Sequence, residues 1–337
     1  MTRKLLPLLV CLALLVGTAV GCGPSKKAEL TKIRLTEVIR SVFYTPMYVA
    51  ISKGFYKDAG LDIDFSTAWG TDKGTAALLS GSVDIALIGP EGAIYTHQQG
   101  AQNPVQIFAQ LTNKDGSFLV ARQKTDNFQW SDIKGKTVLG NRPGGMPEMV
   151  AEWVYKRNGV DPEKDVTIIK NIALNAMVGA FKGGLGDYCQ VFEPLASQLE
   201  QDGAGYVVAS FGQAAGPMPY TCFEATEKYI KDHPDIIQAF ADATLRGMLW
   251  TKENSAENVA AAIQMFFPDT PKEILISVVE RYKKYDTWAP DPILRPEAFD
   301  LVQEIMIAGS ILTEKQPYDK CAVTRFAENA VKRIKKP

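Results

Sequence analysis

The sequence predicts an α/β protein of two lobes that are joined by a two-strand hinge and enclose a cleft. From Lys32 onward, short apolar strands alternate with amphipathic helices, an order typical of sheets covered by helices. The 337-residue chain is longer than one ordinary core requires and suits two domains. Residues 210–219 are rich in glycine and proline, which favours a crossing back to the first lobe.

The predicted first lobe begins with a βαβα pattern. Thr45 and Pro46 provide an N-cap and a proline at the first helical position, so a helix is expected to begin there and end near Gly60. Apolar and polar residues alternate over 61–65, as in a half-buried strand. Further strands are expected at 33–38, 83–88 and 105–110, and further helices at 73–79 and 92–99. This order predicts a mainly parallel sheet.

A second α/β unit is predicted after Leu111. Strands are expected at 117–121, 137–140, 166–169, 188–192 and 206–209, with a helix at 147–157. Beyond Tyr220 the pattern becomes helical, and Phe240 and Leu245 are spaced for a core-facing stripe. We therefore expect lobe 1 to comprise residues 31–111 and 220–337, and lobe 2 to comprise residues 112–219.

The N-terminus has the features of an export signal. Arg3 and Lys4 precede an apolar run over 5–16, and small residues follow it. The apolar run is too short to cross a bilayer comfortably, since that requires about 20 residues. We therefore expect residues 1–21 to be a removable signal peptide and the mature protein to be exported.

Residues 19–22 (AVGC) resemble the lipobox of bacterial lipoproteins, with Ala19 where leucine is usual. In such proteins the cysteine is lipidated and becomes the mature N-terminus. We expect Cys22 to carry the lipid and residues 22–30 to form a flexible tether to the outer face of the cell membrane. The alternative is ordinary cleavage near Gly21, with Cys22 incidental.

Composition excludes several classes of function. The chain has 37 basic and 38 acidic residues, and the loss of Arg3 and Lys4 leaves a net charge of about −3. This charge argues against nucleic acid or an anionic membrane surface as the main partner. The remaining cysteines, Cys189, Cys222 and Cys321, are widely spaced, which indicates buried thiols and no disulfide scaffold or zinc site. We expect neither a metal nor a cofactor.

Several segments resemble, in order along the chain, those of the nitrate, sulfonate and thiamine-precursor binding proteins. Residues 54–63 (GFYKDAGLDI) resemble G-F-F-x-x-x-G-L-D-V, residues 79–86 (LSGSVDIA) resemble L-x-S-G-x-V-D-I-A, and residues 133–138 (IKGKTV) resemble L-K-G-K-x-V. The turn at 192–194 (FEP) and the C-terminal segments 309–312 and 326–327 are also similar. The resemblance implies a type II periplasmic-binding-protein fold. It also implies ABC permease subunits with a cytoplasmic ATPase as partners.

The candidate cleft follows from a general rule for open α/β sheets. Ligands bind outside the carboxyl ends of the strands, where loops lead into helices. The residues selected by this rule and by the two crossings are Arg40, Ser41, Tyr44, Tyr48, Trp69, Gly70, Pro90, Glu91, Thr112, Asp115, Ser117, Arg142, Gly144, Gly145, Phe192, Glu193 and Tyr220.

Two chemistries are open for the ligand. The aromatic residues of this set can stack on a planar ligand, and Glu193 can accept hydrogen bonds from an amino group or a protonated ring. Alternatively, each aromatic side chain belongs to the hydrophobic core of its lobe, and the Glu193 carboxylate caps the helix that begins after Pro194. Glu91 has the alternative of a solvated first-turn residue.

Residues 141–147 form a glycine-rich turn before a helix, which with Arg142 suits an anion. Its alternative is a purely structural turn, and Glu148 in the first helical turn argues against an anion. Glu193→Gln is therefore expected to impair binding of a heterocycle most, and Arg142→Ala binding of an anion.

Catalysis is not expected. His97 and His233 are the only histidines, and no Gly-x-Ser-x-Gly, His-Glu-x-x-His, Walker or Gly-x-Gly-x-x-Gly motif occurs. The resemblance extends to fungal thiamine-pyrimidine synthases, which use an active-site histidine with a cysteine-rich motif that this chain lacks.

The function expected is that of a monomeric, extracytoplasmic solute-binding lipoprotein of an ABC importer. Its ligand is expected to be an aminopyrimidine like a thiamine precursor, or a similar heterocycle. The alternatives are an alkanesulfonate such as taurine, nitrate or another small anion, and a ligand sensor that docks to a receptor.

Overall fold

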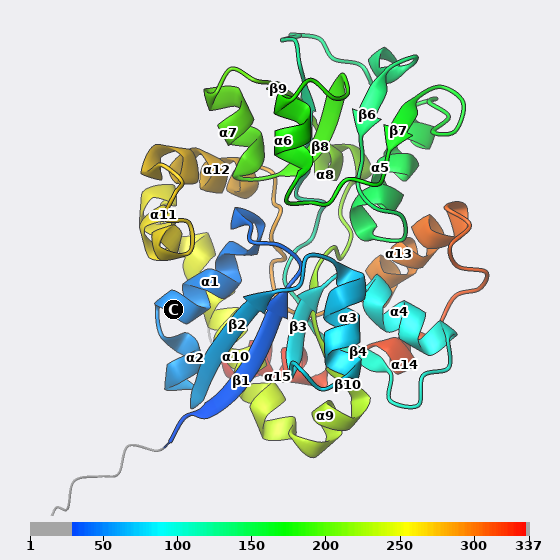
Figure 1. Cartoon of the computed structure of the whole chain (residues 1–337). Coiled ribbons are helices and arrows are strands. Elements are labelled where there is room, and N and C mark those ends of the chain that lie inside the picture. Colours follow the sequence, from blue (N-terminus) through cyan, green and yellow to red (C-terminus); the bar gives the residue numbers. More distant parts are fainter. Residues whose placement is uncertain (1–28, 335–337) are drawn as a thin grey trace, which may run out of the picture.

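The computed structural model describes residues 29–334 and contains two α/β lobes, each built on one five-stranded sheet (Figure 1). The predicted fold class is confirmed. The predicted signal peptide and Cys22 lie outside the described residues. Between residues 29 and 334, no helix is both long and apolar enough to cross a membrane.

The sheet of lobe 1 has the order β2-β1-β3-β10-β4. Its strands are β1 (Thr31–Glu37), β2 (Leu61–Thr67), β3 (Ile85–Ile88), β4 (Val105–Gln110) and β10 (Cys222–Thr226). The sheet of lobe 2 has the order β7-β6-β8-β5-β9. Its strands are β5 (Ser117–Ala121), β6 (Thr137–Leu139), β7 (Thr167–Ile169), β8 (Tyr188–Phe192) and β9 (Tyr206–Ser210).

The sheet of lobe 1 is mainly parallel, as expected, and each lobe has one antiparallel strand. β10 is antiparallel to β3 and β4, and β5 is antiparallel to β8 and β9. Each of these strands follows a crossing from the other lobe, so the chain enters the sheet at the cleft side. The other four strands of each sheet are parallel to one another and run toward the cleft.

Helices cover both sheets. In the N-terminal part they are η1 (Val42–Tyr44), α1 (Thr45–Ser52), α2 (Phe55–Asp58), α3 (Thr71–Leu79) and α4 (Glu91–Gln98). Lobe 2 contains η2 (Trp130–Ile133), α5 (Met146–Arg157), α6 (Met177–Lys182), α7 (Leu195–Gln201) and α8 (Phe211–Ala215). The C-terminal part contains α9 (Glu227–Asp232), α10 (Pro234–Glu253), α11 (Ala256–Ile263), η3 (Gln264–Phe266), α12 (Lys272–Lys284), α13 (Pro296–Ala308), α14 (Tyr318–Cys321) and α15 (Arg325–Arg333).

Two local differences from the predicted helices have clear causes. The single helix expected from Thr45 to Gly60 is divided into α1 and α2, because Gly54 adopts a left-handed conformation with φ of 76°. Within the predicted crossing at 210–219, the chain forms the short helix α8. The Ser210 side chain caps this helix by accepting a hydrogen bond from the Gln213 N–H at 3.3 Å.

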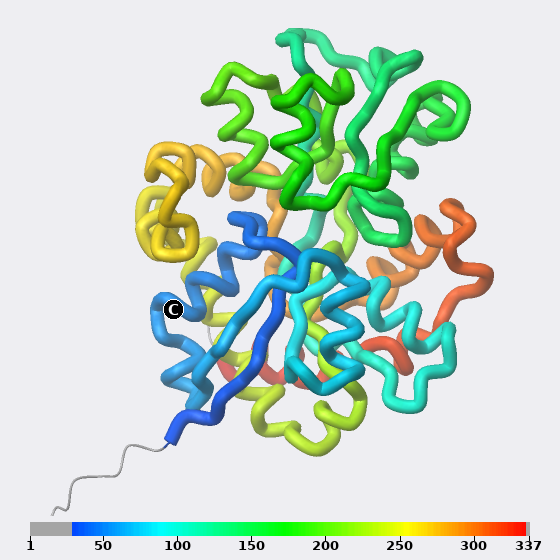
Figure 2. Tube along the Cα trace, viewed as in Figure 1, coloured from blue at the N-terminus to red at the C-terminus, as the bar shows by residue number. Residues whose placement is uncertain are grey.

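Three segments lie side by side between the lobes (Figure 2). The first two crossings are linked where the Leu111 N–H donates to the Thr221 carbonyl at 3.0 Å. A third segment after α12 joins them, since the Ala289 N–H donates to the Leu111 carbonyl at 3.0 Å and the Asn113 N–H to the Thr287 carbonyl at 2.8 Å. The two crossings of the expected hinge are therefore flanked by a third segment, which packs beside them.

Aromatic packing anchors the C-terminal helices to the sheet of lobe 1. The Phe240 ring of α10 lies 4.9 Å from Phe223 of β10 and 5.7 Å from Phe108 of β4, and all three side chains are buried. The free cysteines Cys189 and Cys222 are buried in the sheets, and Cys321 is buried on α14. These contacts fix the strands whose ends form the cleft.

Candidate functional site

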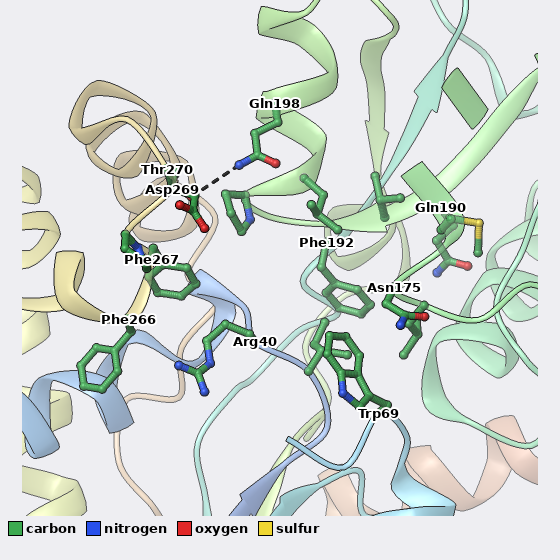
Figure 3. A pocket seen from close by; sticks show the side chains of 17 residues that line it. Arg40, Trp69, Asn175, Gln190, Phe192, Gln198, Phe266, Phe267, Asp269 and Thr270 are labelled. Atoms are coloured by element: carbon green, nitrogen blue, oxygen red, sulfur yellow. Dashed lines mark hydrogen bonds between the residues drawn. The ribbon is translucent and has the colours of Figure 1, made fainter. Parts of the chain in front are cut away.

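Two cavities lie between the lobes. The first, of about 340 Å³, is lined by Arg40 and Trp69 of lobe 1, by Gln190 and Phe192 of lobe 2, and by residues 266–270 after α11 (Figure 3). The second, of about 650 Å³, is lined by α3 and α4 of lobe 1 and by the loops of lobe 2 around Arg142 and Lys170. Both cavities take residues from both lobes, so together they define an interlobe cleft.

A buried polar cluster lies between the lobes and consists of Glu91, Asp115, Ser117, Gln190 and Tyr220. Gln190 Nε2 donates to Ser117 Oγ at 2.9 Å, and the Ser117 N–H donates to Asp115 Oδ1 at 2.6 Å. Burial raises the pKa of Tyr220 well above its usual value, and the nearby charges of Asp115 and Glu91 raise this pKa further. The cluster therefore joins lobe 1, both crossings and lobe 2.

Four polar atoms of the cluster lack a hydrogen bond of good geometry within residues 29–334. The four atoms are Glu91 Oε2, Asp115 Oδ2, Gln190 Oε1 and Tyr220 Oη, and all of them are buried. The Tyr220 hydroxyl is nevertheless close enough to the Asp115 carboxyl to influence its pKa, as is the Thr71 hydroxyl to the Glu91 carboxyl. Buried polar atoms nearly always have a partner, and each one left without a partner costs about 1–3 kcal/mol. Three of the four atoms are acceptors, so the cluster suits a ligand with several N–H donors.

The cluster also holds two acidic groups without a cationic partner. Burial raises the pKa of Glu91 from 4.5 to about 7 and the pKa of Asp115 from 3.8 to about 6. No lysine or arginine of the described chain is among the groups that influence either pKa. Burial also raises the pKa of Glu224 on β10, and the charge of Glu91 adds to this shift. A positively charged ligand would relieve the cost of ionising Glu91 and Asp115.

The position of Glu91 follows from the turn between β3 and α4. A Cβ atom at Gly89 would lie 1.9 Å from Glu91 Oε2, so the carboxylate folds back over a glycine. The other oxygen, Oε1, accepts a hydrogen bond from the Met146 N–H of lobe 2 at 3.3 Å. Glu91 therefore contacts the opposite lobe directly.

Two N–H groups of the glycine-rich turn of lobe 2 donate to carboxylates of the protein itself. The Gly144 N–H donates to Glu148 Oε2 at 3.3 Å, and the Met146 N–H donates to Glu91. Lys170 in turn forms an ion pair with Glu148 at 2.6 Å. Carboxylates of the protein itself therefore occupy the start of α5, where the sequence predicted an anion.

Arg142 reaches across the cleft to lobe 1. Its Nη2 atom donates to the Trp69 carbonyl and to Asp72 Oδ1, both at 3.1 Å. A Cβ atom at Gly70 would lie 2.2 Å from this nitrogen, so the glycine makes room for the guanidinium. Arg142 thus joins the lobes and has a carboxylate partner already.

Glu193 has the structural role that the sequence left open. Its carboxylate accepts hydrogen bonds from the N–H and hydroxyl of Ser197 at 2.9 and 3.0 Å, which caps the start of α7. It also pairs with Arg281 Nη1 at 2.6 Å and is 1% exposed. Both oxygens of the Glu193 carboxylate therefore have protein partners, as the capping alternative predicts.

Other predicted residues serve packing or the connection between lobes. Tyr48 donates to Glu37 Oε2 at 2.5 Å inside lobe 1, and Tyr44 is buried against Phe43 with ring centroids 5.4 Å apart. Ser41 Oγ donates to the carbonyl of Glu193 at 2.5 Å across the lobes. The hydroxyl of Thr112 pairs with that of Thr221 at 2.7 Å at the crossings, and Pro90 is the N-cap of α4.

The remaining predicted residues divide among three places. Arg40, Trp69 and Phe192 line the first cavity; Gly70, Arg142, Gly144 and Gly145 line the second; Glu91, Asp115, Ser117 and Tyr220 belong to the buried polar cluster. Residues that sequence reasoning missed are Gln190, Asn175, Phe266 and Phe267 of the first cavity. A glutamine in an otherwise apolar strand was a signal for Gln190, but nothing local marks the other three.

Metal binding has no support among residues 29–334, where no group of three or more His, Cys, Asp or Glu side chains is arranged to hold an ion. His97 and His233 line neither cavity. The described site is therefore one of hydrogen-bond acceptors, carboxylates and aromatic rings.

Comparison with known proteins gives the class of protein that this fold and cleft define. The structure is similar to that of the periplasmic nitrate-binding protein NrtA of Synechocystis PCC 6803, with a TM-score of 0.71 and 18% identity over 92% of this chain and 90% of that one. The alkanesulfonate-binding protein SsuA of Xanthomonas axonopodis pv. citri, bound to MOPS, has a TM-score of 0.71 and 15% identity, over 88% and 99%. The fold is therefore that of the periplasmic binding proteins.

Sequence relatives give the family. The family model described as NMT1/THI5 like matches residues 42–258. YtlA of Bacillus subtilis (strain 168), for which a binding function is proposed, is 45% identical over 90% of this chain and 91% of its own length. The 4-amino-5-hydroxymethyl-2-methylpyrimidine phosphate synthase of Schizosaccharomyces pombe is 25% identical over 62% of each chain. The chain belongs to the NMT1/THI5-like family.

Proposed function

We propose that this protein is the extracytoplasmic solute-binding lipoprotein of an ABC importer, and that its ligand is a small heterocycle with amino groups, such as an aminopyrimidine. The observation that carries the proposal is the pair of buried carboxyl groups, Glu91 and Asp115, neither of which forms a salt bridge with a lysine or arginine of the described chain. An amino group or a protonated ring nitrogen can donate to such a carboxylate.

The charge of the site favours this ligand over a small anion. A sulfonate or nitrate would meet the carboxyl groups of Glu91 and Asp115, and burial strengthens the repulsion between like charges when these groups are ionised. The groups that the sequence assigned to an anion are occupied, since Arg142 pairs with Asp72 and the start of α5 holds Glu148. The nitrate and alkanesulfonate named for the structural neighbours therefore remain the second candidates.

We also infer from the residues of the cleft that the protein binds its ligand and does not transform it. A general base or nucleophile must lie within hydrogen-bond reach of the reacting atom. Neither histidine lines a cavity, and burial of Cys189 raises the pKa of its thiol to about 12. We infer that the relationship to a synthase reflects a shared ligand-binding fold, with import as the role of this chain.

Closure of the lobes would couple binding to delivery. Contacts that join the lobes directly include Tyr95 Oη to the Gly144 carbonyl at 2.9 Å and Met146 N–H to Glu91 at 3.3 Å. A ligand that bridges the lobes favours the closed arrangement, because only there can it contact both. The permease would then recognise the closed form.

Lipidation at Cys22 is the second part of the proposal. Expression of the full chain in a bacterial host is expected to place it in the membrane fraction with a diacylglyceryl group at Cys22, detectable by mass spectrometry. Cys22→Ala should release the protein or block its processing. Recovery of unmodified wild-type protein, cleaved beside Gly21, would contradict this part and leave the ligand proposal intact.

A thermal-shift screen of the protein from Lys26 onward tests the ligand class. Aminopyrimidines, flavins, alkanesulfonates, taurine, nitrate and bicarbonate should be compared. A ligand at 100 times its Kd stabilises the folded state by about 2.7 kcal/mol, which is expected to raise Tm by several degrees. Stabilisation by aminopyrimidines supports the proposal; stabilisation by an anion alone would favour the second candidate.

A further inference from the structure

The first cavity and the buried polar cluster share a wall. Gln190 and Phe192 are two residues apart on β8, so their side chains point to the same face of the sheet. Gln190 donates to Ser117 of the cluster, and the Phe192 ring lies 6.4 Å from the ring of Tyr220. Both residues also line the first cavity. A ligand held by the cluster therefore lies next to this cavity.

The first cavity is partly aromatic. Trp69, Phe192, Phe266 and Phe267 line it together with polar side chains, which are Asn175, Gln190, Gln198, Asp269 and Thr270 (Figure 3). Its one cationic side chain, Arg40, interacts with other residues of lobe 1. The Arg40 guanidinium pairs with Glu37 at 2.7 Å and stacks 4.4 Å from the centre of the Phe65 ring. The aromatic part of the cavity therefore suits a flat apolar group.

Trp69 provides an independent indication of ligand contact. Its backbone has a φ of 62°, a left-handed conformation that is rare for a bulky residue and costs about 1–3 kcal/mol. The side chain is nevertheless 41% exposed, so burial of the indole does not offset this cost. Arg142 of lobe 2 holds the Trp69 carbonyl at 3.1 Å. Strained residues of this kind cluster at ligand clamps.

We propose that the first cavity is a second subsite for the same ligand, which takes an aromatic ring attached to the amino-bearing heterocycle bound by the cluster. This inference rests on the proposed function and adds to it. The ligand class is then a two-ring molecule, in which an N–H-donating head lies at Glu91 and Asp115 and an apolar ring stacks among Trp69, Phe192 and Phe267.

Two probes that differ only in the second ring test the subsite. Calorimetric titration of 2,4-diaminopyrimidine and 5-benzyl-2,4-diaminopyrimidine compares the head alone with the head and ring. The benzyl compound is expected to bind at least about 10-fold more tightly, because the ring buries apolar surface in the cavity. Equal affinities would overturn the subsite and leave the proposed function standing. Failure of both probes to bind at 1 mM would overturn both.

Substitutions of cavity residues test whether the gain in affinity from the benzyl ring arises in the first cavity. Trp69→Ala is expected to reduce the advantage of the benzyl compound to about 2-fold or less while the affinity for 2,4-diaminopyrimidine stays unchanged. Phe267→Leu, which keeps most of the buried volume, should reduce the advantage partially. Met265→Ala is the matched control, since Met265 precedes Phe266 and is 69% exposed outside the cavity. An undiminished benzyl advantage in both cavity variants, or an equal loss in the control, would contradict the assignment.

Discussion

Glu91 of lobe 1 and Met146 of lobe 2 are joined by a hydrogen bond of 3.3 Å from the backbone N–H to the carboxylate. The second oxygen of the same carboxylate has no hydrogen bond of good geometry in the described part of the chain. Glu91 is thus both a contact between the lobes and an acceptor for the proposed ligand.

Replacing Glu91 by glutamine tests this double role. The amide keeps the shape of the side chain but replaces a charge-assisted hydrogen bond by a weaker neutral one. Affinity for an aminopyrimidine, measured by calorimetry, is expected to fall about 10-fold or more, since charged hydrogen bonds contribute about 1.5–3 kcal/mol. Glu163→Gln, at an exposed position of lobe 2, serves as the control. Equal affinities for wild type and Glu91→Gln would remove Glu91 from the site.

Stability of the ligand-free protein should depend on pH through the same carboxylate. Burial raises the pKa of Glu91 from 4.5 to about 7, so the folded state binds this proton more tightly than the unfolded state. Its contribution is therefore fully favourable below pH 4.5 and is lost as the pH rises to about 7.

The comparison with Glu91→Gln isolates this contribution from other titrating groups. Between pH 5 and pH 8, the Tm of the wild type is expected to fall relative to that of Glu91→Gln, by an amount that corresponds to about 3 kcal/mol at most. Parallel Tm profiles for the two proteins would show that Glu91 ionises freely and is not buried as described.

Tyr95→Phe tests the contact between the lobes. Removing the hydroxyl deletes its hydrogen bond to the Gly144 carbonyl at 2.9 Å, which is worth about 0.5–1.5 kcal/mol. The dissociation rate of the ligand is expected to rise about 2- to 10-fold, with little change in Tm. Tyr206→Phe on β9, whose ring is half-buried, is the matched control. A dissociation rate unaffected in Tyr95→Phe would mean that this bond does not hold the closed form.

Glu193→Gln separates a structural carboxylate from a ligand contact. Loss of the charge weakens the cap of α7 and leaves Arg281 without its most buried partner, so the unfolding free energy is expected to fall by about 2–4 kcal/mol. Ligand affinity of the folded variant should be unchanged. Glu200→Gln is the control, because the half-buried Glu200 pairs with the same arginine and should contribute less than about 1 kcal/mol. A loss of affinity at constant Tm would restore the original ligand-binding interpretation.

Much of the fold could be predicted from local sequence. The strands β4, β5 and β8 have the predicted bounds, because their apolar runs are short and end at clear turn signals. The antiparallel direction of β10 was not predictable from its own residues. It results from the route of the chain between the lobes, which depends on contacts distant in sequence.

The site was predictable only in part, for the same reason. The rule about carboxyl ends of strands located Glu91 and Trp69, since each follows a strand directly. That rule could not assign the role of Glu193, because its partner Arg281 is on α12. Nor could it find Phe267, which reaches the cavity through tertiary packing of the C-terminal helices.

The central claim is that a buried, acidic site selects an amino-bearing heterocycle over an anion. Calorimetric titration of the wild-type protein at pH 7 with 4-amino-5-hydroxymethyl-2-methylpyrimidine and with ethanesulfonate tests it most directly. The account predicts saturable binding of the pyrimidine and none of the sulfonate. Saturable binding of ethanesulfonate, with no heat from the pyrimidine, would contradict it.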